Sequence, residues 1–395
     1  GGTSTDVSLY AGQPEIAASC EVAGLHLVKP TLRVHTIAAG GGSILQFASG
    51  RLQVGPESAG ANPGPMAYGR SGPLTVTDAN LMLGRIQAEF FPAVFGPDAN
   101  QRLNTNLVKQ EFARLAKEIS AAGEQSYTGE QAAAGFLRIA VDNMANAIRH
   151  ISIQRGQNPA DFTLCCFGGA AGQHACQLAD QLGMQRILLD PLAGVLSAHG
   201  IGVAPLRSYR QIAVNRPLVA DSLADLQSRR LQLEQQCRKL LEQQDIPADR
   251  IQAEAWLEIK QAGSDTTLSI AWHATESPAE AFYEQHQHRF GFAPVNSEIV
   301  IASMRVEAAG NRNPPAGTTN QQPLPSSPEP AAALTDADIF IGTGWLNAPV
   351  YDRARLQPGA RLTGPALITE QHSTTLLEPG WDLEVNHALQ LVLTR

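Results

Sequence analysis

The chain has 395 residues, of which 43% are hydrophobic and 17% are charged, so it is long enough to bury more than one core. Its net charge of -8 argues against nucleic acid or an anionic membrane surface as a partner, because both select clustered Lys and Arg. No apolar run approaches the roughly 20 residues of a spanning helix, and no signal-peptide pattern opens the chain, so we expect a soluble cytoplasmic protein.

The five cysteines form neither a dense disulfide framework nor a paired CxxC zinc pattern. We therefore interpret them as reduced structural thiols. Cys165 and Cys166 lie in an apolar, strand-like run just before a glycine loop, and we expect both to pack in the core.

The first 100 or so residues are rich in Gly and Pro and contain short apolar alternations, such as 32–37 and 51–54, that predict short strands between loops. The chain begins with Gly1-Gly2-Thr3-Ser4-Thr5-Asp6. A turn of this composition normally follows a buried strand, and that strand is absent here. We therefore expect a truncated or processed chain.

Helical periodicity follows over 105–122 and 128–154, and Thr128 with Gln131 resembles a capping box at the start of the second helix. Residues 162–167 then predict a strand, 168–172 a loop, 173–182 a helix and 186–189 another strand. This order is typical of an α/β fold with a loop at the carboxyl end of a strand.

The remaining chain predicts a polar helix over 222–244 and strands over 253–260 and 266–272. Turns at Pro358-Gly359, Gly364-Pro365 and Pro379-Gly380 suggest a small β-rich region near the C-terminus. We predict four parts in chain order: a nucleotide-binding domain over 1–205, an α+β extension over 206–310, a linker or long loop over 311–330 and a small β-rich domain over 331–395.

The opening motif combines glycines, hydroxyls and a carboxylate. Glycines let backbone N–H groups approach a phosphate, hydroxyls can donate to its oxygens, and Asp6 can bind Mg²⁺ or orient water. A solvent-exposed Gly-Thr-Ser turn is the alternative.

The loop at Gly168, Gly169 and Gly172 follows a strand and opens a helix, so its N–H groups could face a nucleotide. Close packing between strand and helix explains the same glycines equally well. His174, just after this loop, is more typical of a first-turn helix residue with a hydrogen-bonding task than of a catalyst.

A third donor-rich loop contains Gly40, Gly41 and Gly42, and Thr77-Asp78-Ala79-Asn80 follows further along the chain. Asp78 and Asn80 precede the apolar residues 81–83, where they could cap a helix. Metal or substrate binding is the competing role.

Five strings occur in the order and with the spacing of one enzyme family: GGTSTDVSLYAG, IAAGGGSILQFASGRLQVGPESAGANPGP, TVTDANLMLGR, CFGGAAGQHACQLADQLGM and GVLSAHGIGVA. They resemble the signatures of the hydantoinase A/5-oxoprolinase family. FGPDANQRLN and GPALITEQHSTTLLEPGW are similar to its 5-oxoprolinase branch.

The resemblance implies an acetate kinase/sugar kinase/Hsp70/actin-like (ribonuclease H-like) nucleotide-binding fold of the α/β class. It also implies ATP and Mg²⁺ as cofactors, and a hydantoinase B-type region or subunit as a partner in a homo- or hetero-oligomer. The implied reaction opens 5-oxo-L-proline to L-glutamate through a phosphorylated amide, and the implied small-molecule partner is 5-oxoproline or a related cyclic amide. Alternatives are a hydantoinase or N-methylhydantoinase, an acetone carboxylase-type subunit, or a non-catalytic nucleotide-binding fragment.

The expected site then follows from the motifs. We predict catalytic and metal-binding roles for Asp6 and Asp78. We predict cofactor binding by Gly1, Gly2, Thr3, Ser4, Thr5, Gly40, Gly41, Gly42, Gly168, Gly169 and Gly172. Because one nucleotide has a phosphate end and a nucleoside end, we expect the loops at 1–6 and 168–174 to line one cleft.

Overall fold

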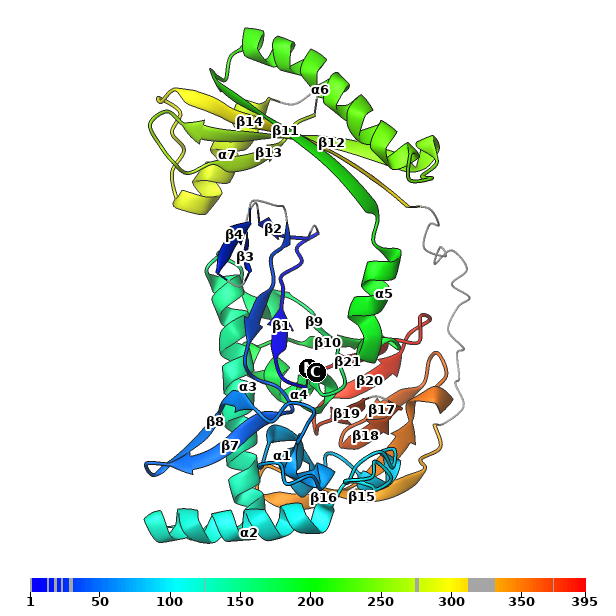
Figure 1. The fold of residues 1–395 in the computed structure, drawn as a ribbon. Helices are drawn as coiled ribbons and strands as arrows, with labels where there is room; N and C mark the ends of the chain where they lie inside the picture. The colour runs from blue at the N-terminus through cyan, green and yellow to red at the C-terminus, as the bar shows by residue number, and fades with distance from the viewer. Residues whose placement is uncertain are drawn as a thin grey trace. The chain divides into compact units, whose positions relative to one another are not determined.

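The computed structural model describes residues 1–395 except 1, 13, 18–19, 23, 28–30, 124, 274–276, 312–330 and 372. For residues 17, 20–22 and 26–27 it describes the backbone but not the side chains. The chain divides into two compact units, Gly1–Leu196 with Gln321–Arg395 and Ser197–Asn320. The strands of each unit pair among themselves (Figure 1). Each unit also has a hydrophobic core of its own. The fold is mixed α/β, as the sequence predicts.

The largest sheet of the first unit has five strands in the order β17-β20-β21-β10-β9. They are β9 (Leu164–Cys166), β10 (Arg186–Leu189), β17 (Arg361–Thr363), β20 (Asp382–Val385) and β21 (Leu391–Thr394). Only β9 and β10 are parallel, and α4 (Ala175–Leu182) connects them. This stretch confirms the predicted strand–loop–helix–strand unit and places the glycine loop at the carboxyl end of β9.

Three further helices pack together in this unit. They are α1 (Val76–Met82), α2 (Thr105–Ala122) and α3 (Gly129–Ile153). The predicted capping box begins α3: Thr128 Oγ1 accepts the Gln131 N–H at 3.3 Å, and Gln131 Oε1 accepts the Thr128 N–H at 2.9 Å. Side chains one turn apart on α3, such as Phe136 and Ala140, are buried against α1, α2 and α4, so the predicted long buried helix is confirmed.

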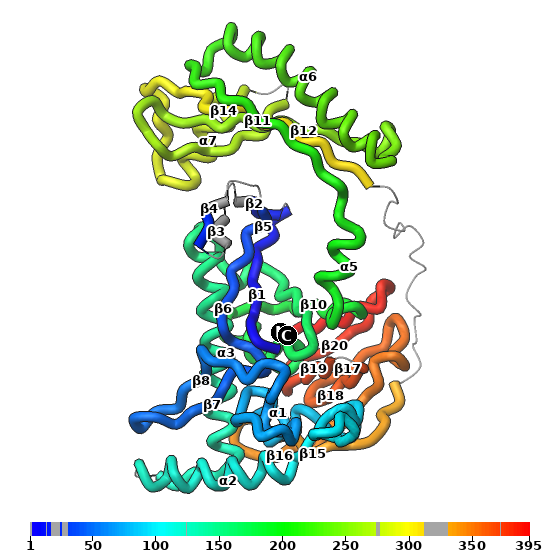
Figure 2. The backbone as a smooth tube through the Cα atoms, viewed as in Figure 1, coloured from blue at the N-terminus to red at the C-terminus, as the bar shows by residue number. Residues whose placement is uncertain are grey.

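Short antiparallel pairs form the N-terminal part. They are β1 (Thr5–Val7) with β6 (His35–Ile37), β2 (Ile16–Ala17) with β5 (Thr31–Leu32), β3 (Cys20–Val22) with β4 (Leu25–Leu27), and β7 (Ser43–Ala48) with β8 (Arg51–Ser58). Figure 2 follows the backbone from β6 through β7 and β8 into α1. The Gly40–Gly42 turn therefore lies between β6 and β7, beside the start of β1.

The C-terminal segment contributes to two sheets. One contains β15 (Thr335–Ile341), β16 (Gly344–Asp352), β18 (Ala366–Thr369) and β19 (Thr374–Leu377) in sequence order. The other is the five-stranded sheet, in which β21 pairs with β10 from Leu391↔Leu189 to Thr394↔Arg186. The sequence predicts a small β-rich domain over 331–395, and three strands of this segment, β17, β20 and β21, lie in the same sheet as β9 and β10.

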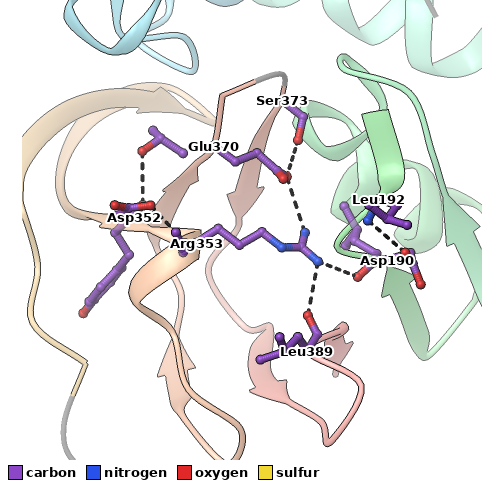
Figure 3. A network of polar contacts seen from close by, with 11 residues as sticks. Asp190, Leu192, Asp352, Arg353, Glu370, Ser373 and Leu389 are labelled. Atoms are coloured by element: carbon purple, nitrogen blue, oxygen red, sulfur yellow. Dashed lines mark hydrogen bonds and ion pairs between the residues drawn. The ribbon is translucent and has the colours of Figure 1, made fainter. Parts of the chain in front are cut away.

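Arg353, in the C-terminal segment of the first unit, contacts the end of β10 in its N-terminal segment (Figure 3). Its guanidinium donates to Leu189 O at 3.0 Å and to Leu389 O at 3.4 Å, and it pairs with Glu370 at 3.4 Å. Burial lowers the pKa of Arg353, and Glu370 and Asp190 raise it. One buried cation thus joins the end of β10 to the turn between β20 and β21.

The second unit is a four-stranded antiparallel sheet, in the order β11-β14-β12-β13, with helices. Its elements are β11 (Leu206–Pro217), α6 (Ala220–Glu242), β12 (Ile251–Gln261), β13 (Leu268–Ala271), α7 (Pro278–Phe290) and β14 (Ile299–Gly310), and α5 (Leu196–Val203) begins at the last residue of the first unit. The sequence predicts α6, β12 and β13 but not α7. Most of the predicted linker, 312–330, lies outside the described residues.

Short 3₁₀ helices complete the described chain: Met66–Tyr68, Ala88–Phe90, Pro159–Asp161, Ala171–Gln173, Ala193–Val195, Ala248–Arg250 and Arg353–Arg355. Within the described ranges, no helix has both the length and the apolar character needed to cross a membrane.

The adjacent residues Cys165 and Cys166 differ in their exposure to solvent. Cys166 is buried, as predicted, but Cys165 is exposed. The reason is the period of two in β9, which sends neighbouring side chains to opposite faces of the sheet. The prediction that both pack in the core is therefore wrong for Cys165.

Candidate functional site

The first predicted loop leads into β1. Gly1 lies outside the described residues, Gly2 and Thr3 are exposed, and Ser4 is half-buried. Thr5 Oγ1 donates to Ala39 O at 2.5 Å, which ties β1 to the end of β6. Asp6 is exposed, and its Oδ1 accepts a hydrogen bond from Thr36 Oγ1 at 2.7 Å. The Asp6 carboxylate is thus accessible, with one hydroxyl holding it in place.

The second turn, Gly40–Gly42, is buried. The Gly42 N–H donates to Gly2 O at 2.5 Å. A methyl group on Gly42 would lie 2.9 Å from Gly2 O and 2.9 Å from Ser58 Oγ, so a side chain has no room there. The sequence needs glycine here because two backbones approach each other closely.

Gly41 is the point where the predicted loops meet. A methyl group on Gly41 would lie 2.8 Å from Thr77 Oγ1, 3.9 Å from Gly2 O and 3.9 Å from the Ala170 Cβ. Thr77 belongs to α1, Gly2 to the first loop and Ala170 to the loop that follows β9. Segments more than 100 positions apart in the sequence therefore lie side by side at this residue.

The third loop turns sharply after β9. Gly168 has a φ of +88°, which only glycine adopts readily, and its N–H donates to Ala193 O at 2.7 Å. A methyl group on Gly172 would lie 2.6 Å from Thr375 Oγ1 and 2.9 Å from Thr374 O. Gly172 therefore allows close packing on β19, which is the alternative that the sequence left open.

The backbone donors of these loops differ in what they contact. Gly40 donates its N–H to Ser43 Oγ at 2.9 Å, and Gly42 and Gly168 also donate within the protein. Among the described residues, none accepts a hydrogen bond from the N–H of Gly2, Gly41, Gly169 or Gly172. These N–H groups are the ones that a bound phosphate or nucleoside could use, whereas Gly40, Gly42 and Gly168 use theirs to shape the turns.

Asp78 has a structural task at the start of α1. Its carboxylate accepts hydrogen bonds from Thr75 N at 2.7 Å, Ala67 N at 2.8 Å and Met66 N at 3.1 Å, and from the Thr75 hydroxyl at 2.8 Å. Burial raises the pKa of Asp78 to about 6, and the hydrogen bonds oppose this rise. Of the two roles left open for Asp78, the structure shows the capping one, as a capping box with Thr75 in a helix that begins five residues earlier than expected. The catalytic and metal-binding role of Asp78 stays a prediction.

A buried polar group lies next to the third loop. Asn80 Nδ2 is 3.4 Å from His174 Nε2, and Arg85 donates to Gln173 O at 3.3 Å and pairs with Glu378 at 3.3 Å. Burial, followed by the charge of Arg85, lowers the pKa of His174 to about 3, so the imidazole is neutral. The sequence did not single out Arg85 or Glu378, although Arg85 ends the TVTDANLMLGR string.

The described residues contain no group of three or more His, Cys, Asp or Glu side chains arranged to hold a metal ion. Mg²⁺ bound with a nucleotide commonly uses only one or two protein carboxylates and keeps several waters. Asp6, with the hydroxyls of Thr3 and Ser4 nearby in sequence, fits that smaller requirement. Gly41 and Gly42 allow close packing, because a methyl group on either would meet Thr77 Oγ1, Gly2 O or Ser58 Oγ.

Comparison with known proteins agrees with these features. Residues 1–210 match the hydantoinase/oxoprolinase family, and residues 224–389 match the hydantoinase/oxoprolinase C-terminal domain. The chain is 34% identical over 385 residues to 5-oxoprolinase of Dictyostelium discoideum, covering 96% of this chain and 30% of that protein. It is 30% identical over 412 residues to the caprolactamase subunit alpha of Pseudomonas jessenii, covering 100% of this chain and 57% of that subunit.

The crystal structure of the ATP-dependent caprolactamase from Pseudomonas jessenii superimposes with a TM-score of 0.82 at 29% identity, over 100% of this chain and 57% of that one. This similarity agrees with the mixed α/β fold. The chain spans about a third of the length of the 5-oxoprolinase that it matches. The family match covers more than half of the chain, so the chain belongs to the hydantoinase/oxoprolinase family.

Proposed function

We propose that this chain is part of an ATP-dependent enzyme that opens the cyclic amide 5-oxo-L-proline to L-glutamate. The observation that carries the proposal is the meeting of the loops at Gly41, where Gly2, Thr77 and Ala170 surround one turn. One loop comes from the start of the chain and another follows β9, so the two ends of one nucleotide can be held together. The 5-oxoprolinase relative supports the choice of substrate.

The roles of the residues follow from their contacts. Gly41 and Gly169 offer backbone N–H groups, and Thr3 and Ser4 offer hydroxyls, as donors to phosphate oxygens. Asp6 is the accessible carboxylate of the first loop and is assigned to Mg²⁺ or to the attacking water. Asp78 supports the site from the core, by fixing the Met66–Ala67 turn through its hydrogen bonds. The nucleoside end is assigned to the loop at Gly168–Gly172.

Hydrolysis of a cyclic amide requires activation of the amide group, because a lactam carbonyl is a poor electrophile. Transfer of a phosphoryl group from ATP to the amide oxygen would activate the carbon toward water. The ring C–N bond would then break with the nitrogen leaving as an amine, and a second water would release phosphate from the resulting acyl phosphate. The contribution of this chain is to position these groups and to stabilise charge. The missing length relative to the 5-oxoprolinase, and the designation of the caprolactamase relative as a subunit alpha, support a hydantoinase B-type region or subunit as partner within an oligomer.

A second candidate is hydrolysis of a different lactam. The caprolactamase subunit alpha aligns with the whole of this chain. Supplying 5-oxo-L-proline and caprolactam as competing substrates, and comparing kcat/KM for each, separates the two. A preference for caprolactam would reassign the substrate while leaving the ATP-dependent reaction type in place.

Asp6 provides the direct test of the site. In the complete enzyme, with the B-type region present, we expect Asp6→Ala to reduce 5-oxoproline-dependent ADP release on the order of 100-fold or more, the effect of losing one electrostatic stabiliser. The matched control is Asp98→Ala, another exposed carboxylate, which we expect to leave the rate unchanged. If Asp6 serves only its bond to Thr36, the rate would stay near normal and the role of Asp6 would be lost.

A further inference from the structure

Helix α1 contacts two of the three glycine loops. At its first turn, Thr77 N and Thr77 Oγ1 donate to Gly41 O at 2.8 and 2.9 Å. One turn later, Asn80 Nδ2 bonds to Val76 O at 3.1 Å and lies 3.4 Å from His174 Nε2. Just beyond the helix, Arg85 donates to Gln173 O at 3.3 Å. One short rigid segment thus spans the distance between the Gly40–Gly42 turn and the turn that follows β9.

At this position the charged side chain of Arg85 is buried, which costs desolvation free energy. It is 3% exposed, and its partner Glu378, just after β19, is 9% exposed. Burial lowers the pKa of Arg85, and burial raises the pKa of Glu378, while each charge opposes the shift of the other. A buried ion pair of this kind is often less stabilising than well-packed apolar side chains of the same volume. Stability alone therefore does not account for it.

The same neighbourhood holds polar atoms that are incompletely satisfied. Among the described residues, buried side-chain atoms without a hydrogen-bond partner include Asn80 Oδ1, Arg85 Nε, His174 Nδ1 and Thr375 Oγ1. Each such atom costs free energy when it is buried. All four residues lie on or beside the contact between α1, the Gly168–His174 turn and β19. A fold that only needed a packed core would place apolar groups there.

We propose that Arg85 and Asn80 are positioning residues, which hold the Gly168–His174 turn in register with the Gly40–Gly42 turn through α1. This rests on the proposed nucleotide site. Arg85 carries the larger share, because its planar guanidinium contacts Gln173 O and Glu378 with different nitrogens. Loss of this clamp lets the turn after β9 shift, and the two ends of a nucleotide then no longer meet their loops together.

The experiment separates folding from positioning by replacing both charges. In Arg85→Met/Glu378→Met no charge is left unpaired, so we expect the thermal midpoint to stay within a few degrees of the wild type. The dissociation constant for Mg-ADP, measured by calorimetry on the same preparation, should rise by at least about 10-fold, because small misplacements weaken positioned contacts steeply. The result that overturns the inference is a folded double variant that binds ADP as the wild type does.

The matched control is the pair of buried Arg353 and half-buried Glu370, which lies at a similar distance of 3.4 Å and whose arginine donates to Leu189 O and Leu389 O rather than to a carbonyl of the Gly168–His174 turn. Arg353→Met/Glu370→Met should leave ADP affinity within about twofold of the wild type. An equal loss of affinity in this control would contradict the specific role of Arg85.

A conservative variant covers the case in which the double variant does not fold. Arg85→Lys keeps the charge beside Glu378 but replaces the planar fork, whose two nitrogens each make one contact, by a single ammonium on a flexible stem, so it does not reproduce the geometry of both contacts. We expect it to fold and to bind ADP more weakly than the wild type, and unchanged binding would refute the clamp. If the wild-type protein itself binds no ADP, the proposed nucleotide site fails, which is a different outcome from a variant that binds equally well.

Discussion

At the scale of single residues, His174 is a histidine that the fold keeps neutral. Burial and the nearby Arg85 lower its pKa from 6.5 to about 3. Below pH 6.5 the unfolded chain binds a proton on this imidazole while the folded chain does not, so stability falls as the pH decreases toward 3. The loss is at most about 1.4 kcal/mol for each pH unit.

We therefore expect His174→Gln to remove part of the decrease in the free energy of unfolding between pH 6.5 and pH 4. Urea unfolding at a series of pH values measures it. His199→Gln, at an exposed position, is the control and should keep the wild-type pH dependence. Parallel curves for the wild type and His174→Gln would show that the imidazole is protonated in the folded protein.

At the scale of elements, the Gly40–Gly42 turn fixes where β1 starts relative to α1. A methyl group on Gly42 would meet a backbone carbonyl, Gly2 O, at 2.9 Å, and backbone cannot move aside as a flexible side chain can. We expect Gly42→Ala to lower the free energy of unfolding by about 1–3 kcal/mol, the usual range for overpacking, and to weaken ADP binding.

Gly344→Ala is the control for this substitution, because nothing lies within 4 Å of a methyl group there. We expect it to stay within about 0.5 kcal/mol of the wild type. Denaturant unfolding and calorimetry on both variants check the comparison. Equal, small effects would mean that the turn adjusts and that close approach at Gly42 is not required.

At the scale of the whole molecule, each unit has a core of its own. Phe136 is 0% exposed in the core of the first unit, and Phe282 is 1% exposed in the core of the second. Replacing either by Ala should cost about 3–5 kcal/mol, because a cavity remains. We expect Phe282→Ala to speed amide hydrogen exchange over 206–310 and to leave ADP affinity unchanged, whereas Phe136→Ala should weaken ADP binding. Loss of ADP binding in Phe282→Ala would show that the second unit takes part in the site.

Local sequence determined much of the first unit. The periodicity of α2 and α3, the capping box at Thr128 and the β9–α4–β10 stretch depend on neighbours a few residues apart, so they can be read from the chain. The glycine loops were predicted for the same reason, since backbone turns need glycine wherever they occur. The family also followed from sequence, because its strings retain their order and spacing.

Only the tertiary structure decided which of these parts meet. The pairing of β10 with β21, the ion pair of Arg85 with Glu378 and the meeting of Gly2, Thr77 and Ala170 at Gly41 join segments far apart in the chain. The capping box of Asp78 needed the true start of α1, which no strong apolar period marks. Local propensities do not encode such contacts, because they depend on which buried surfaces and unpaired strand edges the folded chain brings together.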